Sequence, residues 1–210
     1  MIRILIVDDH DLVRHGLGRI FEKTQGMKIV AEISSGIDAL HWLRHNECDV
    51  VLLDISMPGL SGIEVLKKVH QDKPSLPILI LSNYPEDQYA LRLIKSGASG
   101  YLTKGCATAV MVNAVRDVAT GKKYFSPAVQ EMLVNEVSMP AEKLPHEILS
   151  DREFNIFLLL AAGKGVNEIA DQLLISNKTV STHKANLMLK MNLHNVPDLV
   201  RYAVKHGLAD

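Results

Sequence analysis

The feature that most constrains the fold is an alternation of short apolar runs and amphipathic segments through the first 120 residues. Each run is rich in β-branched residues and ends near a turn signal, which is typical of a strand. The runs around Leu5 and Leu52 are apolar almost without interruption, as expected for strands covered on both faces. The five predicted strands are residues 2–7, 28–33, 49–53, 78–81 and 100–102.

The segments between these runs carry apolar residues three or four positions apart, as amphipathic helices do. Val13 and Leu17 illustrate the first helix, and Ile63, Leu66 and Val69 the third. Strands that alternate with helices predict an α/β fold with a parallel, doubly wound sheet. Ligands of such folds bind outside the carboxyl ends of the strands, where the strand order reverses.

The alternation of strand-like and helix-like segments ends after Gly121. Residues 126–137 predict a short helix, because Pro127 stands where a first helical residue is expected. Residues 138–149, with Pro140 and Pro145, are typical of a linker.

From Ser150 onward the sequence shows only helical patterns, beginning with the capping-box spacing of Ser150 and Glu153. We therefore expect an α/β domain followed by a small all-α domain of about four helices. The predicted domains are residues 1–121 and 148–210, joined by a linker at 122–147 that includes the short helix.

The composition of the chain helps to predict the cellular compartment of the protein but says little about its binding partners. No apolar stretch approaches the roughly 18–20 residues of a membrane span, and no secretory leader pattern is visible. Cys48 and Cys106 cannot build a disulfide framework and lack metal-ligand spacing. We expect a cytoplasmic protein, with both thiols reduced and no membrane association.

Three acidic residues follow two of the predicted strands. Asp8 and Asp9 come after the first strand, and Asp54 ends the third. If the strand order is 2-1-3-4-5, these strands are neighbours and the carboxylates converge. Like charges at such distances are costly unless a cation neutralises them, and an all-oxygen pocket suits Mg²⁺.

Ser82 and Lys104 should lie at the edge of the same crevice, because they end or follow the fourth and fifth strands. A carboxylate nucleophile, a cation site, a hydroxyl and a lysine together can accept a phosphoryl group. Taken singly, Asp8, Asp9 and Asp11 could cap the first helix, and Lys104 could be a solvated lysine. Their combination favours the phosphoryl site.

Four segments distributed over the first 121 residues belong together. They are Val7-Asp8-Asp9-His10, Leu53-Asp54-Ile55-Ser56-Met57-Pro58-Gly59, Leu81-Ser82 and Gly97-Ala98-Ser99-Gly100-Tyr101-Leu102-Thr103-Lys104. In these segments the first 121 residues resemble the receiver domains of bacterial response regulators. The resemblance implies a flavodoxin-like (βα)5 fold with sheet order 2-1-3-4-5. It also implies that Asp54 takes a phosphoryl group from a sensor histidine kinase or phosphotransfer protein.

The same resemblance assigns the ligands of Mg²⁺. Asp9, Asp54 and the backbone carbonyl of Ser56 would hold the ion, and Asp8 would act through water.

The resemblance further implies that Ser82 and Lys104 contact the phosphoryl oxygens, and that Tyr101 turns inward as Ser82 moves. Two departures from the family stand out. Lys104 precedes Gly105 where many receivers have a proline, and Ser82 replaces the frequent threonine.

The C-terminal segment contains two helical patterns joined by a tight turn. Residues 165–173 form the first pattern, and Ser176 is a natural N-cap for the second. Residues 150–210 carry seven basic and six acidic side chains, so charge alone does not identify a nucleic-acid-binding domain. Residues 176–191, however, contain three lysines and no acid, as a helix in the major groove requires. A solvated face of an ordinary helical bundle is the alternative.

Three further segments lie in the C-terminal part of the chain: Leu149-Ser150-Asp151-Arg152-Glu153, Asn167-Glu168-Ile169-Ala170 and Ser176-Asn177-Lys178-Thr179-Val180-Ser181-Thr182-His183. In these segments, residues 148–210 resemble the LuxR-type helix-turn-helix of the FixJ/NarL class of response regulators. It implies binding to double-stranded promoter DNA and a homodimer that forms on phosphorylation. The residues expected to face DNA are Lys178, Thr179, Ser181, Thr182, Lys184 and Ala185.

We therefore predict a phosphorylation-controlled transcription factor, active at DNA, and not a turnover enzyme. One alternative is an aspartate-nucleophile phosphohydrolase, but such enzymes usually carry an Asp two residues after the nucleophile, where this chain has Ser56. Another is a docking or DNA-binding module that no longer depends on phosphate, against which the complete acidic site argues.

Overall fold

The computed structural model describes residues 1–138 and 144–209, so the predicted linker residue Pro140 lies outside the described residues. The chain divides into two compact units, Met1–Val134 and Asn135–Asp210. Each unit is considered by itself. Within the described ranges, no helix combines the length and apolar character of a membrane span.

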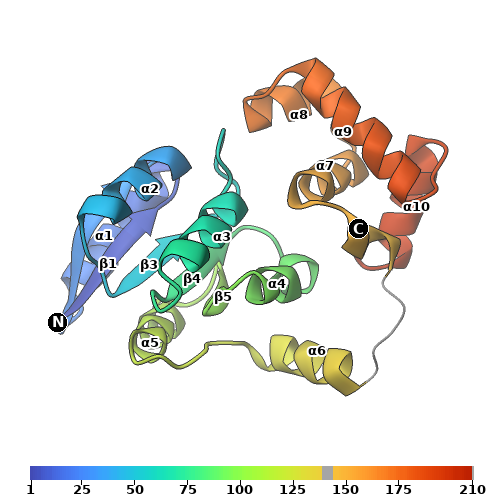
Figure 1. Ribbon diagram of the computed structural model, residues 1–210. Helices are drawn as coiled ribbons and strands as arrows, with labels where there is room; N and C mark the ends of the chain where they lie inside the picture. The colour runs from blue at the N-terminus through green and yellow to red at the C-terminus, as the bar shows by residue number, and fades with distance from the viewer. Residues whose placement is uncertain (139–143, 210) are drawn as a thin grey trace. The chain divides into compact units, whose positions relative to one another are not determined.

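The first unit is built on a parallel sheet with the strand order β2-β1-β3-β4-β5 (Figure 1). The predicted order is confirmed. The strand ends differ from the predicted ones by one residue or less, and Ser82 closes β4. The strands are β1 (Ile2–Val7), β2 (Met27–Ile33), β3 (Val50–Leu53), β4 (Ile78–Ser82) and β5 (Gly100–Thr103).

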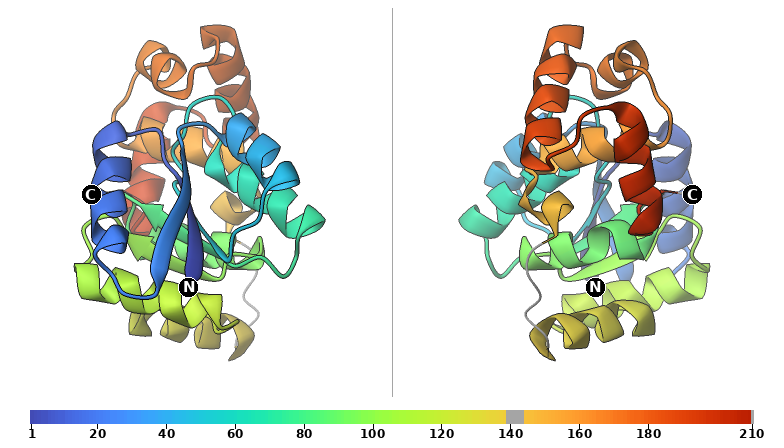
Figure 2. Two further views of the ribbon diagram at one scale, coloured as in Figure 1. Left: turned by 90° about the vertical axis from the view of Figure 1, so that its left-hand side faces the viewer. Right: turned by 90° about the vertical axis from the view of Figure 1, so that its right-hand side faces the viewer.

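Helices cover both faces of this sheet, with α1 and α5 on one face and α2, α3 and α4 on the other (Figure 2). Alternate residues of the strands, including Ile4, Leu52 and Leu79, form one core with Phe21 of α1 and Val115 of α5. Every residue of β3 and β4 is buried, as their continuous apolar sequences predict. The helices are α1 (Asp11–Glu22), α2 (Gly36–His45), α3 (Gly62–Asp72), α4 (Glu86–Lys95) and α5 (Thr108–Ala119).

A close approach between backbones fixes the loop from β3 to α3. Ser61 and Glu64 form a capping box that starts α3. A Cβ atom at Gly62 would lie 1.9 Å from the Asp54 carbonyl oxygen, so this position accepts only glycine. The capping box and Gly62 thus hold the end of β3, where Asp54 lies, against the first turn of α3.

Helix α6 (Pro127–Ser138) begins where the sequence predicts a helix, and Ser126 Oγ accepts a hydrogen bond from the Val129 amide at 3.3 Å. The division between the two units falls inside this helix.

The second unit continues with η1 (Pro145–Ile148) and four α-helices, the number expected from the sequence. The predicted capping box of Ser150 and Glu153 starts the first of the four. Ile156, Ile169, Val180 and Leu199 contribute one buried side chain from each helix to the core. The helices are α7 (Asp151–Ala161), α8 (Val166–Leu173), α9 (Asn177–Lys190) and α10 (Val196–Lys205).

Candidate functional site

Three carboxylates meet at the carboxyl ends of β1 and β3. Asp8 and Asp9 follow β1, and Asp54 follows β3. The Asp54 amide donates to the Val7 carbonyl at 2.8 Å, which holds the two strand ends together. Asp8 and Asp54 are each only 2% exposed. Two acids are therefore buried side by side, which is unfavourable without positive charge nearby.

Lys104 supplies part of that charge. Its Nζ atom lies 2.7 Å from Asp8 Oδ2 and 3.0 Å from Asp54 Oδ2. The Lys104 amide also donates to the Ser82 carbonyl at 2.8 Å, so the end of β4 positions the lysine. The structure thus brings Asp8, Asp54, Ser82 and Lys104 to one edge of the sheet.

The pKa directions indicate that burial outweighs the effect of Lys104 at Asp54. Burial raises the pKa of Asp54, and the Asp8 charge adds to that shift, although the Lys104 ammonium opposes it. For Lys104, burial works to lower the pKa, but the Asp54 and Asp8 carboxylates outweigh burial and raise it. The lysine is held charged while the aspartate remains short of compensating charge.

The donor atoms fit a hard divalent cation. One atom each of Asp8, Asp9, His10 and Asp54 can be chosen so that all lie within 4.8 Å of one another. Asp9 Oδ1 is buried and accepts no hydrogen bond, and His10 Nδ1, at 2.9 Å, is not aligned for one. Mg²⁺ is usually bound through one or two carboxylates and keeps several waters, which this cluster can accommodate. His10 belongs to this cluster although the sequence predicted no role for it.

Ser56 lies beside the same pocket. Its amide donates to Asp54 Oδ1 at 3.3 Å, so the backbone after β3 turns around the aspartate. Helix α1 has His10 as its N-cap residue and no side-chain cap, while Asp8 Oδ1 accepts from the His10 amide at 2.9 Å. Side-chain capping of α1 therefore does not explain why Asp8, Asp9 and Asp11 are all acidic.

The hydroxyl groups of Ser82 and Tyr101 both form hydrogen bonds with the backbone of Tyr84. Ser82 Oγ accepts from the Tyr84 amide at 3.1 Å, and the Tyr101 hydroxyl donates to the Tyr84 carbonyl at 2.8 Å. Tyr101 is 1% exposed, so it already occupies the inward position, and burial raises its pKa. Tyr84, which the sequence analysis did not identify, connects the serine to the tyrosine.

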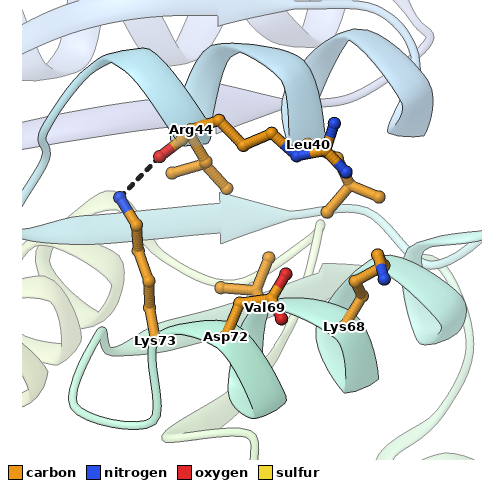
Figure 3. A pocket seen from close by; sticks show the side chains of 7 residues that line it. Leu40, Arg44, Lys68, Val69, Asp72 and Lys73 are labelled. Carbon is orange, nitrogen blue, oxygen red and sulfur yellow. Dashed lines mark hydrogen bonds between the residues drawn. The ribbon is translucent and has the colours of Figure 1, made fainter.

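A small pocket between α2 and α3 lies at the opposite edge of the sheet, where these helices end (Figure 3). Lys73 donates to the Leu43 carbonyl at 2.5 Å and so joins the two helix ends. The lining is mostly apolar and includes the side chains of Leu40 and Val69 and the aliphatic parts of Arg44 and Lys68. We regard this pocket as a packing feature, because its charged groups do not converge on it.

The second unit presents its candidate residues on α9. Ser176 Oγ caps the helix by accepting from the Thr179 amide at 3.1 Å. Val180, Leu187 and Met191 are buried and lie on the core side of this helix. Of the residues expected to face DNA, Lys184 is half-buried and the others are exposed: Lys178, Thr179, Ser181, Thr182 and Ala185.

Family comparisons agree with both halves of this description. Residues 4–116 match the response regulator receiver domain, and residues 147–203 match the luxR family of bacterial regulatory proteins. The chain belongs to the LuxR-type response regulators.

Two curated relatives support this membership over the full length. Response regulator UvrY of Escherichia coli K12 is 39% identical, with 100% of this chain and 97% of UvrY covered. Response regulator GacA of Pseudomonas aeruginosa PAO1 is 36% identical, with 100% and 99% covered. The protein is therefore a transcription-factor response regulator.

A solved structure of RcsB from Salmonella enterica serovar Typhimurium, bound to the rprA promoter with the phosphomimetic BeF3⁻, is also similar. Its TM-score is 0.64 at 26% identity, with 96% of this chain and 98% of RcsB covered. The receiver fold and the C-terminal helical domain of this regulator are thus both shared with solved relatives.

Within the regulator's C-terminal unit, the start of α7 anchors the far end of α9. Glu153 Oε2 accepts from the Ser150 amide at 2.8 Å and from Lys190 Nζ at 2.6 Å. Glu153 is 4% exposed, and these donors lower its pKa although burial, the largest effect, acts to raise it. One carboxylate therefore both caps α7 and fixes the orientation of α9.

Proposed function

We propose that phosphorylation of Asp54 controls dimerisation and promoter binding by the C-terminal helix-turn-helix. The observation that carries this proposal is the position of Asp54, buried beside Asp8 and in contact with Lys104. The phosphodonor would be a sensor histidine kinase or phosphotransfer protein. An Asp54 carboxylate oxygen attacks phosphorus, the phosphorus–nitrogen bond to the donor histidine breaks, and an acyl phosphate forms on Asp54.

In this proposal Asp9, Asp54 and the Ser56 carbonyl would hold Mg²⁺, and Asp8 would contribute through water. The bound ion would supply positive charge for the phosphoryl oxygens. Lys104 and Ser82 bind those oxygens, while Tyr101 senses the position of Ser82 through the Tyr84 loop. Phosphorylation is the only chemistry assigned to the chain, so it is proposed not to be a turnover enzyme.

The proposed output is sequence-specific binding of promoter DNA in the cytoplasm by residues 148–210. Residues 1–121 would be the phosphoacceptor domain and residues 122–147 the linker. The similar protein RcsB is bound to promoter DNA in its solved complex, which supports the same activity here. The proposed contacts are Lys178, Thr179, Ser181, Thr182, Lys184 and Ala185. A roughly −1.5 to −2 charge added at Asp54 would shift the receiver toward a dimer that binds paired half-sites.

The proposal is tested by selecting duplexes from a random pool and measuring their affinity by fluorescence anisotropy. Titrations with and without acetyl phosphate and Mg²⁺ are compared for the wild type and Asp54→Asn. We expect the phosphodonor to tighten binding by the wild type and to leave Asp54→Asn unaffected. Equal wild-type affinities under both conditions would contradict control by phosphorylation.

A further inference from the structure

The exposed face of α9 is less polar than its sequence suggests. Thr182 is exposed, but its Oγ1 donates to the Lys178 carbonyl one turn earlier at 2.9 Å. This back-bonding to the preceding turn is a common use of a threonine hydroxyl inside a helix. Because the oxygen is held against the backbone, the methyl group is what Thr182 presents outward.

Ala185 extends this apolar surface. It is exposed and lies three positions after Thr182, where helix geometry places side chains about 5–6 Å apart on one face. The two methyl groups therefore form one small apolar patch near the middle of α9 (Asn177–Lys190).

A second hydroxyl of the same helix is also occupied. Thr179 Oγ1 lies 2.8 Å from Ser176 Oγ within the helix cap. Of the three hydroxyl residues expected to face DNA, two thus have their oxygens engaged in the helix itself. Donation by the Thr182 hydroxyl to a base acceptor would require breaking its bond to Lys178.

In the major groove, the thymine C5-methyl group is the apolar feature that distinguishes a T·A pair. We propose that Thr182 and Ala185 form an apolar reader of a thymine methyl group, which makes thymine the preferred base at one position of each half-site. Lys178 and Lys184 then serve the phosphates or neighbouring bases. This inference rests on the proposed DNA-binding function.

The test replaces each thymine of a selected duplex in turn by deoxyuracil, which removes only the methyl group. We expect one thymine per half-site at which deoxyuracil weakens wild-type binding about fourfold, the effect of losing one buried methyl-sized group. Substitutions at thymines outside the half-sites are the matched DNA controls. Equal binding of thymine and deoxyuracil at every position would overturn the inference.

Two variants separate the methyl group from the hydroxyl. Thr182→Val keeps a methyl group and should preserve the thymine-to-uracil affinity ratio. Thr182→Ser keeps only the hydroxyl and leaves Ala185 as the one remaining methyl group, so it should lower that ratio. The opposite pattern would show that the hydroxyl reads the base. Failure to select any duplex would instead overturn the proposed function on which the inference rests.

Discussion

Each unit of the regulator contains a buried carboxylate beside a lysine, and the two pairs behave differently. Lys104 Nζ lies 3.0 Å from Asp54 Oδ2 in the first unit, and Lys190 Nζ lies 2.6 Å from Glu153 Oε2 in the second. Yet the pKa of Asp54 is raised and that of Glu153 is lowered.

Burial is the largest effect at both carboxylates and acts to raise both pKa values, but the donors outweigh it only at Glu153. The neighbouring groups differ accordingly. Glu153 shares its lysine with no other acid among the contacts described, and the Ser150 amide adds a second donor. Asp54 shares Lys104 with Asp8, and its only other described donor is the Ser56 amide at 3.3 Å. A carboxylate with a lysine of its own stabilises structure, whereas an undercompensated one, which shares its lysine with a second acid, is available for a cation and for chemistry.

The largest effect is expected from breaking the satisfied pair. Lys190→Met leaves the Glu153 carboxylate buried with only its hydrogen bonds from Ser150, so the second unit should lose about 2 kcal/mol of stability. Hydrogen exchange of the α7 and α9 amides measures this loss, and Lys205→Met, at an exposed position, is the control. Unchanged exchange in α7 and α9 would show that the pair contributes no stability.

Removing a cation ligand from the undercompensated site should weaken Mg²⁺ binding. Asp9→Asn deletes the charge of the buried oxygen that accepts no hydrogen bond, and we expect affinity to fall at least about tenfold. Isothermal titration calorimetry compares it with Asp11→Asn, which changes an exposed carboxylate nearby. If both variants bind Mg²⁺ as the wild type does, the ion does not use Asp9.

The comparison also predicts that one substitution increases stability instead of lowering it. In EDTA, Asp54→Asn removes one of two adjacent buried negative charges, so the first unit should become more stable, by about 1 kcal/mol. Urea unfolding followed by the fluorescence of Trp42, the single tryptophan, reports on this unit. A loss of stability would mean that Asp54 is as well compensated as Glu153.

The smallest effect is a difference in pH dependence. Because the folded-state pKa of Glu153 is lowered from its usual value of 4.5, its contribution to stability is present above pH 4.5. This contribution is lost as the pH falls through the lowered pKa. Glu153→Gln should therefore flatten the acid side of the stability profile of α7 and α9, as followed by hydrogen exchange. An unaltered slope would place the acid sensitivity elsewhere.

Much of the first unit could be predicted because its signals are local. Continuous apolar runs such as Val50–Leu53 identify buried strands, and the sheet edge that collects Asp8, Asp54 and Lys104 follows from the topology. The exposed face of α9 follows in the same way from helical spacing.

The missed features depend on tertiary geometry. His10 joins the acidic cluster because the turn after β1 brings its ring to Asp9, and Tyr84 acts through backbone groups that any residue possesses. The capping box predicted a local role for Glu153, but its bond to Lys190 spans 37 positions. No local periodicity reports such a contact.

The central claim is that Asp54 is the undercompensated carboxylate that accepts a phosphoryl group. Intact-protein mass spectrometry after incubation with acetyl phosphate and Mg²⁺, on the wild type and Asp54→Ala, tests it most directly. The account predicts a phosphoryl-sized mass gain in the wild type only. A gain of equal size in Asp54→Ala, or none in the wild type, would contradict it.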